Sequence, residues 1–169
     1  MKVIANTTII SIFAAVGRLD VLRDLLGELF ITTEVYAEIQ DGLAEGYAFY
    51  AGIELHMSPF TTKGWLHLTS LQDDEEFRIL NNMPAGLHRG EVSCLAVALR
   101  RGMAFLTDDA RARAAAHGLH ILVSGTLGVL VSAVKQKLLT PDTADSLLTQ
   151  MIQAGYRSPH DTLLELLGD

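Results

Sequence analysis

The chain has 169 residues, of which 49% are apolar and 20% charged, and its formal net charge at pH 7 is −7. This length and apolar content are enough to bury one sizeable core, which argues against an intrinsically disordered protein. The single cysteine, Cys94, excludes an internal disulfide and a cysteine-based zinc site. The lack of a disulfide is typical of the reducing cytosol, so we expect a cytoplasmic protein; no apolar run is long enough to predict a membrane span, so we expect no membrane partner.

The charges are unevenly distributed along the chain. Residues 81–140 hold seven basic and three acidic residues, a net charge of +4, whereas the remainder has a net charge of −11. A basic segment of this kind can present a positive face to a phosphate backbone. Its arginines can equally be the solvated sides of helices, and the sequence leaves both interpretations open.

Short apolar runs alternate with helical patterns along most of the chain. The apolar runs predict strands at 3–5, 29–32, 65–69, 103–107 and 120–123. The helical patterns predict helices at 9–16, 18–26, 33–38, 91–101, 109–118 and 125–137, followed by two short C-terminal helices. Thr33 is expected to cap the third helix, and Thr140 and Ser158 the last two, each before a proline.

The region from residue 41 to residue 82 carries the weakest pattern. Glycines and Pro59 interrupt residues 41–60, where a helix over 47–54 is a weaker prediction. The acidic run at residues 72–76 is expected to be the solvated start of a further helix, because acids favour helix N-termini.

Strands separated by helices of about ten residues predict parallel pairing with helices on both faces of a sheet. We therefore expect an α/β protein, a three-layer α/β/α sandwich with a central parallel sheet of four to five short strands. Residues 1–140 are expected to form this domain, and residues 141–169 a helical tail packed on it.

Polar residues gather at the predicted ends of two strands. In an open parallel sheet, ligands bind outside the carboxyl ends of the strands. Carboxylates that converge there without basic partners repel one another unless a hard divalent cation lies among them, and oxygen donors without thiols suit Mg²⁺ or Mn²⁺. The polar residues concerned are Asn6, Thr7 and Thr8 after the first strand, Thr107, Asp108 and Asp109 after the fourth, and Glu38 and Glu91 within helices among apolar neighbours.

Four segments carry a resemblance to a known family. They are the strand ending at Asn6, VGRLDVLRDLLGELFITTEVYAEI, GEVSCLAVALRRGMAFLTDDARAR and GTLGVLVSAVKQKLL. In this order they resemble PIN-domain proteins, of the kind similar to VapC toxins of toxin–antitoxin pairs. The resemblance covers most of the chain, including the GYRSPHDTLLELLG tail, and is weakest from residue 41 to residue 82.

The resemblance implies a PIN-like endoribonuclease that binds Mg²⁺ or Mn²⁺ and cleaves RNA, with a cognate antitoxin as a further partner. By position, the implied catalytic residues are Glu38, Glu91 and Asp109. The implied metal-binding residues are Asn6, Glu91, Asp108 and Asp109, and the candidate substrate-binding residues are Thr7, Thr107, Arg111 and Arg113. The chain departs from the family pattern at Asn6, where the first family acid stands, and the lost charge weakens the expected hold on the metal.

Purely structural roles for the same residues stay open. Asp108 and Asp109 can be a helix cap, Glu91 can cap its own helix, and Glu38 can be an exposed helix residue. Apolar helix faces and four leucines of the tail predict a homodimer or a groove for an antitoxin, although the tail can also dock on its own core. Those leucines are Leu163, Leu164, Leu166 and Leu167.

Three functions follow from these alternatives. The first is a metal-dependent endoribonuclease, the toxin of a type II toxin–antitoxin pair. The second is a catalytically impaired PIN-like module, altered at Asn6, that binds RNA or a protein partner. The third is a receiver-type phosphorylation domain, which would carry paired acids after its first strand and a lysine after its last. This chain has neither feature, since Asn6 and Thr7 follow the first strand and no lysine lies within residues 123–125.

Overall fold

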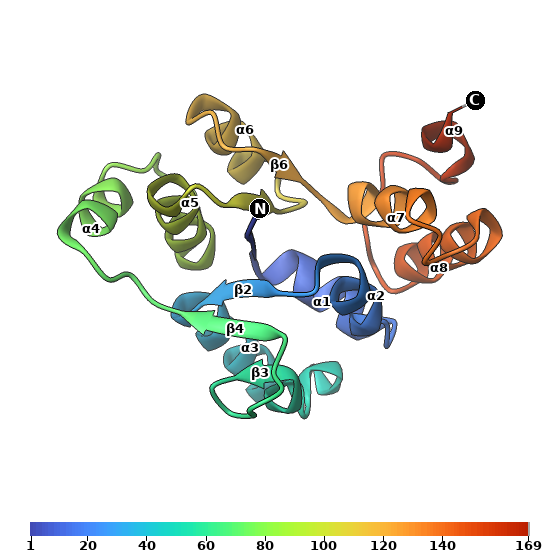
Figure 1. The fold of residues 1–169 in the computed structure, drawn as a ribbon, viewed down its shortest axis with the longest axis horizontal. Helices are drawn as coiled ribbons and strands as arrows, with labels where there is room; N and C mark the ends of the chain where they lie inside the picture. The colour runs from blue at the N-terminus through green and yellow to red at the C-terminus, as the bar shows by residue number, and fades with distance from the viewer. Residues whose placement is uncertain (169) are drawn as a thin grey trace.

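A computed structural model describes residues 1–168 and contains one parallel sheet (Figure 1). Its strand order is β3-β4-β2-β1-β5-β6, and every pair of neighbouring strands runs parallel. The strands are β1 (Val3–Ala5), β2 (Leu29–Thr32), β3 (Met57–Ser58), β4 (Leu66–Thr69), β5 (Ala104–Leu106) and β6 (Val123–Ser124). From β1 the chain adds β2, β3 and β4 on one side and then crosses to add β5 and β6 on the other.

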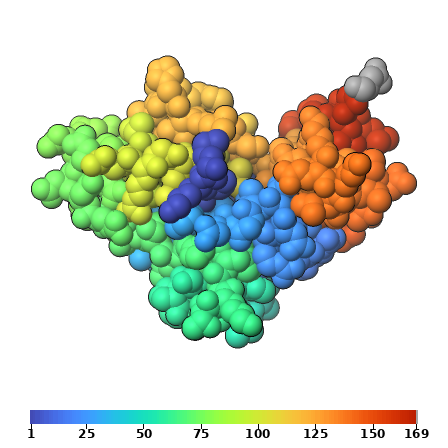
Figure 2. Space-filling view, in the orientation of Figure 1, coloured from blue at the N-terminus to red at the C-terminus, as the bar shows by residue number. Residues whose placement is uncertain are grey.

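Helices cover both faces of the sheet, which confirms the predicted three-layer α/β/α architecture. One layer holds α3 (Thr33–Ala44), α4 (Asp74–Asn81), α5 (Arg89–Arg101) and α6 (Ala110–Gly118). In the other, α2 (Leu19–Leu26) packs on α7 (Thr126–Lys135), and α1 (Thr7–Ala15) and α8 (Pro141–Gln153) contact them. Figure 2 shows α4, in light green, at one end of the molecule and the C-terminal segment, in orange and red, at the other.

The described sheet has six strands, one more than the upper expectation. The additional strand, β3, has two residues and lies in the region with the weakest sequence pattern. The same region forms two short 3₁₀ helices, η1 (Ala48–Tyr50) and η2 (Ile53–His56), where a helix over 47–54 was expected. Two-residue strands and single 3₁₀ turns are too short to show a hydrophobic period, so their existence depends on pairing with β4 and packing on α1 and α3.

Two predicted helix caps were wrong. Thr32, the last residue of β2, caps α3 by accepting a hydrogen bond from the backbone N–H of Val35, whereas Thr33 lies inside the helix. Ser158 caps no helix, because its hydroxyl bonds to the backbone of His160 and the last helix, α9 (Leu164–Leu167), begins later. Thr140 caps α8 as predicted.

The C-terminal tail docks on the core of its own chain. Helix α8 packs on α7 and α1, and Leu163 is fully buried. Leu166 and Leu167 pack against the same core, while Leu164 is exposed. Most of the leucine-rich tail is therefore already covered and offers little apolar surface to another chain.

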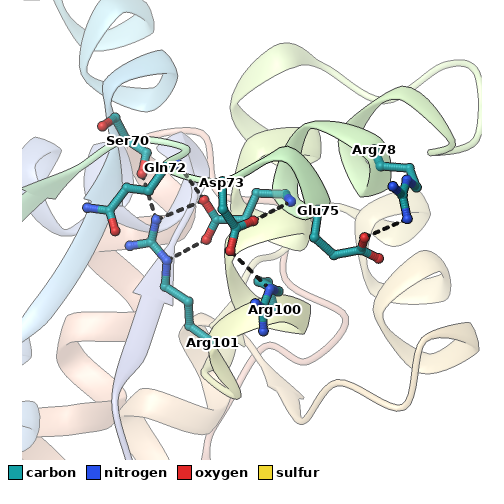
Figure 3. A network of polar contacts seen from close by, with 8 residues as sticks. Ser70, Gln72, Asp73, Glu75, Arg78, Arg100 and Arg101 are labelled. Atoms are coloured by element: carbon teal, nitrogen blue, oxygen red, sulfur yellow. Dashed lines mark hydrogen bonds and ion pairs between the residues drawn. The ribbon is translucent and has the colours of Figure 1, made fainter.

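Helix α4 is joined to α5 by a partly buried ion pair that belongs to the polar network in Figure 3. The acidic run at residues 72–76 is not wholly solvated, because Glu76 is buried and lies 2.6 Å from the guanidinium of Arg101. Arg101 also donates to the Thr69 hydroxyl and the Ser70 carbonyl oxygen, at 2.7 Å each. This arginine holds the pKa of Glu76 below its usual range through the charged hydrogen bond.

No helix within residues 1–168 combines the length and the apolar content that crossing a bilayer requires.

Candidate active site

The candidate site lies at the carboxyl ends of β1 and β5, where the order of strand addition reverses. This reversal separates the loops that follow neighbouring strands and leaves a crevice for ligands. The residues after β1 are Asn6 and Thr7, and those after β5 are Thr107, Asp108 and Asp109. The predicted polar clusters therefore come together because β1 and β5 pair in the sheet.

Asn6, Thr107 and Asp109 form one hydrogen-bonded group. The Asn6 side chain is buried, and its Nδ2 donates to the Thr107 hydroxyl oxygen at 2.8 Å. The same oxygen accepts from the backbone N–H of Asp109 at 3.1 Å, and the Asn6 amide oxygen accepts from the Thr8 hydroxyl at 2.7 Å. Asn6 thus fixes the turn that presents Asp109 and has its amide oxygen already engaged.

Asp109 is the N-cap residue of α6. Its Oδ1 accepts a hydrogen bond from the backbone N–H of Ala112 at 2.8 Å, so the capping interpretation of Asp109 is correct. The cap uses one carboxylate oxygen, and no ion pair forms between Asp109 and a basic residue within residues 1–168.

Glu38 comes from α3 and is held between α1 and α5. Its Oε1 accepts from the backbone N–H of Gly90 at 2.9 Å, and its Oε2 accepts from the Thr7 hydroxyl. The carboxylate lies directly over Gly90, where an added Cβ would come within 2.7 Å of Oε2. Only glycine leaves room for Glu38 at this point, so Glu38 is half-buried and positioned and not a freely solvated helix residue.

Glu91 begins the buried face of α5, next to the glycine that contacts Glu38. Its side chain is 5% exposed and accepts from the backbone N–H of His88 at 2.9 Å, as a first-turn cap does. Burial raises the pKa of Glu91, and the negative charges of Asp109 and Glu38 raise it further, against the opposing effect of the His88 N–H. Without a cation nearby, the ionised form of Glu91 is therefore destabilised.

Asp108 faces away from this group toward the second helical layer. Its two oxygens accept from the backbone N–H and the hydroxyl of Thr126, at 2.8 and 2.6 Å, at the start of α7. The Tyr156 hydroxyl approaches Oδ1 at 3.4 Å. Asp108 therefore joins the end of β5 to α7 and to the chain after α8.

The two arginines predicted to contact substrate are placed differently. Arg113 donates to the carbonyl oxygen of Thr107 at 3.0 Å, which holds it beside the site. Arg111 reaches the carbonyl oxygen of Gly86, in the loop between α4 and α5. Arg113 therefore contacts the turn that carries Asp108 and Asp109, whereas Arg111 contacts the loop before α5.

The donor set matches a hard divalent cation in its chemistry. Glu38, Glu91 and Asp109 are oxygen donors, no thiol is among them, and none forms an ion pair with a basic side chain within the described chain. In residues 1–168, however, no group of three or more His, Cys, Asp or Glu side chains is placed so that it could hold a metal ion. Each carboxylate is oriented instead by a backbone N–H group.

A sequence profile of a PIN-domain family, DUF3368, matches residues 2–168. The chain belongs to this PIN-domain family. Membership in it indicates a nuclease-like function, and divalent metal ions are commonly used by PIN domains. No curated protein matches the chain in a sequence comparison.

The sequence analysis did not identify three residues that contact the site acids: Gly90, Thr126 and Tyr156. The sequence could have pointed to Gly90, because a glycine directly before the first acid of a helix indicates a close approach of the backbone to another group. Thr126 and Tyr156 had no such signal, because they lie 18 and 48 residues from the acid that they contact.

Proposed function

We propose that this PIN-domain protein is a metal-dependent endoribonuclease that hydrolyses RNA phosphodiester bonds. The observation that supports the proposal is that the negative charges of Asp109 and Glu38 raise the pKa of the buried Glu91, and that none of the three acids forms an ion pair with a basic side chain within residues 1–168. Burial and like charge raise the pKa of Glu91, and such acids in a crevice favour a functional over a purely structural role.

Glu91 and Asp109 would hold Mg²⁺ or Mn²⁺, with Glu38 and the Asn6 amide adjoining them. A bound divalent cation would supply a more acidic water and neutralise charge that develops on phosphate oxygens. The chain's own residues orient this set: Gly90 and Thr7 hold Glu38, the His88 N–H holds Glu91, and the Thr107 hydroxyl holds the Asp109 backbone.

Basic and polar residues at the rim support RNA as the substrate. Arg113 is anchored on the Thr107 carbonyl oxygen and keeps its remaining N–H donors for a phosphate. Arg111, on the same helix, extends the basic surface toward Gly86. These contacts would position the backbone without reading the sequence.

We further propose that the protein is the toxin of a type II pair and binds an antitoxin protein, or a second copy of itself, through apolar surface. A groove of about 770 Å³ between α4, α5 and α6 supports a protein partner, since Met83, Leu87 and Leu99 line it. Growth arrest on expression, relieved by the product of a neighbouring small gene, tests the toxin assignment. Light scattering of the purified chain tests the dimer.

A catalytically impaired module is the second candidate, and the contacts of Asn6 favour it. Asn6 supplies no charge, and both its amide groups are already engaged by Thr107 and Thr8. A cation bound here would gain one carboxylate fewer than a site with aspartate at this position, which weakens affinity for Mg²⁺.

Cleavage of labelled RNA in Mn²⁺ separates the two candidates. Wild-type protein is compared with Asp109→Asn and Asn6→Asp, and each variant is checked for folding by circular dichroism. Metal-dependent cleavage by wild type that Asp109→Asn loses supports the endoribonuclease. Cleavage by Asn6→Asp alone supports the impaired module, and no cleavage by any of the three contradicts the nuclease proposal.

A further inference from the structure

A cavity of about 440 Å³ opens beside the two aspartates that follow β5. Three further segments line it: one side of α1 along its length, residues 47–49 at the start of η1, and residues 154–157 after α8. Its aromatic and cationic lining residues are Tyr47, Phe49, Tyr156 and Arg157, and Asp108 and Asp109 form one wall. The three aromatic residues and Arg157 have no part in the endoribonuclease proposal.

Two aromatic rings of this cavity are unusually exposed. Tyr47 is 53% and Phe49 is 38% exposed, with ring centroids 5.8 Å apart and planes tilted by 37°. Phe49 also contacts buried Tyr50, with ring centroids 4.6 Å apart, which holds it in place from below. Exposed and firmly supported ring faces are the surfaces on which unpaired nucleobases stack.

A cation without a protein partner completes the cavity. Arg157 is exposed and forms no ion pair within residues 1–168. It also lines a neighbouring hollow of about 330 Å³, together with Arg113 and with Asp108, whose oxygens Thr126 already engages. Guanidinium groups are the donors that proteins commonly use to bind a phosphate group, and two of them line this hollow.

The backbone after α8 places Arg157 at this position. Gly155 adopts a φ of +105°, a conformation that side chains rarely allow, and it ends the helix. The next residue, Tyr156, turns its hydroxyl to Asp108, so the segment is attached to the loop that carries Asp109. The tail thus reaches the candidate active site by a defined contact.

We propose that this cavity is a nucleotide subsite for single-stranded RNA. The base of a nucleotide next to the scissile phosphate stacks on Tyr47 and Phe49, and the adjoining phosphate binds Arg157 and Arg113. The inference rests on the proposed endoribonuclease function and extends it, because it requires an unpaired base at one defined position. A base within a duplex offers no face to these rings.

The test measures binding of a short fluorescent single-stranded RNA by anisotropy in EDTA, where no metal-dependent cleavage occurs. Phe49→Leu and Tyr47→Leu keep apolar bulk but remove the ring face, and each is expected to weaken binding by about 5-fold or more. Phe77→Leu is the matched control, since Phe77 is 51% exposed on α4, at the far end of the molecule from the tail (Figure 2). It is expected to bind as wild type does.

Two further measurements locate the base and the phosphate. An abasic nucleotide is placed at each position of the RNA in turn. At one position it should weaken binding to wild type, whereas the affinity of Phe49→Leu for the same RNA should not fall further. Arg157→Gln should reduce the slope of log affinity against log salt by about 0.7, as the loss of one phosphate contact predicts for a single strand. Arg78→Gln, a change at an exposed arginine on α4, should leave the slope unchanged.

The outcomes separate the subsite from the nuclease. If wild type cleaves RNA in Mn²⁺ but both aromatic variants bind as tightly as wild type, the subsite is overturned and the endoribonuclease stands. If wild type does not cleave, yet the aromatic and abasic effects appear, the subsite stands as that of an RNA-binding module. If wild type binds no single-stranded RNA, the subsite is overturned as well.

Discussion

Replacing Gly90 with alanine should separate activity from stability in this protein. An added Cβ would lie 2.7 and 2.8 Å from the two carboxylate oxygens of Glu38, where ordinary contact begins at 3.4 Å. The Glu38 carboxylate must therefore move away by about 0.7 Å, because the added Cβ is fixed to the backbone of α5 and cannot move itself. The movement stretches the 2.9 Å hydrogen bond from the Gly90 N–H.

The two consequences of this substitution differ in size. A hydrogen bond to a charged group contributes about 1.5–3 kcal/mol to stability, whereas alanine is favoured over glycine in a helix by up to about 1 kcal/mol. The free energy of unfolding should thus fall by only about 0.5–2 kcal/mol. Under the proposed endoribonuclease function Glu38 belongs to the catalytic set, and displacing such a group by nearly 1 Å can cost about 100-fold in rate, so we expect a fall in kcat of about 10- to 100-fold.

Both quantities are measurable on the same preparation. Urea denaturation gives the free energy of unfolding, and cleavage of labelled RNA at saturating Mn²⁺ gives kcat. Gly118→Ala is the matched control, because Gly118 is also helical and an added Cβ there meets nothing within 4 Å. A Gly90→Ala protein that is folded and cleaves at the wild-type rate would refute the role given to Glu38.

Four other substitutions test the remaining contacts. Arg101→Met leaves the buried Glu76 carboxylate without its cation and should lower the free energy of unfolding, measured in urea, by about 3 kcal/mol or more. Because the folded-state pKa of Glu76 is lowered, this stabilisation is present above the unfolded value near 4.3 and disappears as the pH falls through the folded value, so Glu76→Gln should flatten that part of the stability–pH curve. The folded-state pKa of Glu91 is raised, so ionisation of Glu91 destabilises the protein as the pH rises above the pKa of this group in the unfolded chain. Glu91→Gln should therefore raise the melting temperature of the metal-free protein at pH 7. Mn²⁺ should raise the melting temperature of wild type more than that of the variant. Gly125→Ala would place a Cβ 2.5 Å from Oδ1 of Asp108 and, by displacing it, should lower the free energy of unfolding in urea by about 1–3 kcal/mol; an unchanged value would show that the contact with α7 contributes nothing.

Local chemistry explains why most elements were predictable. The strands β1, β2 and β5 are short apolar runs between polar turns, and α5 and α7 carry helical patterns that end near glycine or lysine. Their alternation predicts parallel pairing, because a strand joined to the next by a helix must return in the same direction. The predictions failed where elements are too short to show a period, as at β3 and η1, or where a polar side chain found a nearer partner, as Ser158 did.

The candidate site was predictable in composition and not in its contacts. Parallel strands end at one edge of a sheet, so polar residues after β1 and β5 had to gather there. Whether Asp109 would cap α6 or Glu91 would cap α5 was left open, and the structure shows both caps. Capping uses part of each carboxylate, which is why the capping and metal-binding interpretations are compatible.

By itself, the sequence determined the α/β class, the order of the elements and the sheet edge at which polar residues follow β1 and β5, because these depend on local periodicity and on strand direction. Tertiary structure alone decided which partner each acid has: Gly90 for Glu38, Thr126 for Asp108, and Arg101 for Glu76. These pairs are 52, 18 and 25 residues apart in the chain. Contacts at such separations are selected by packing of the whole core, and no local pattern in the sequence encodes them.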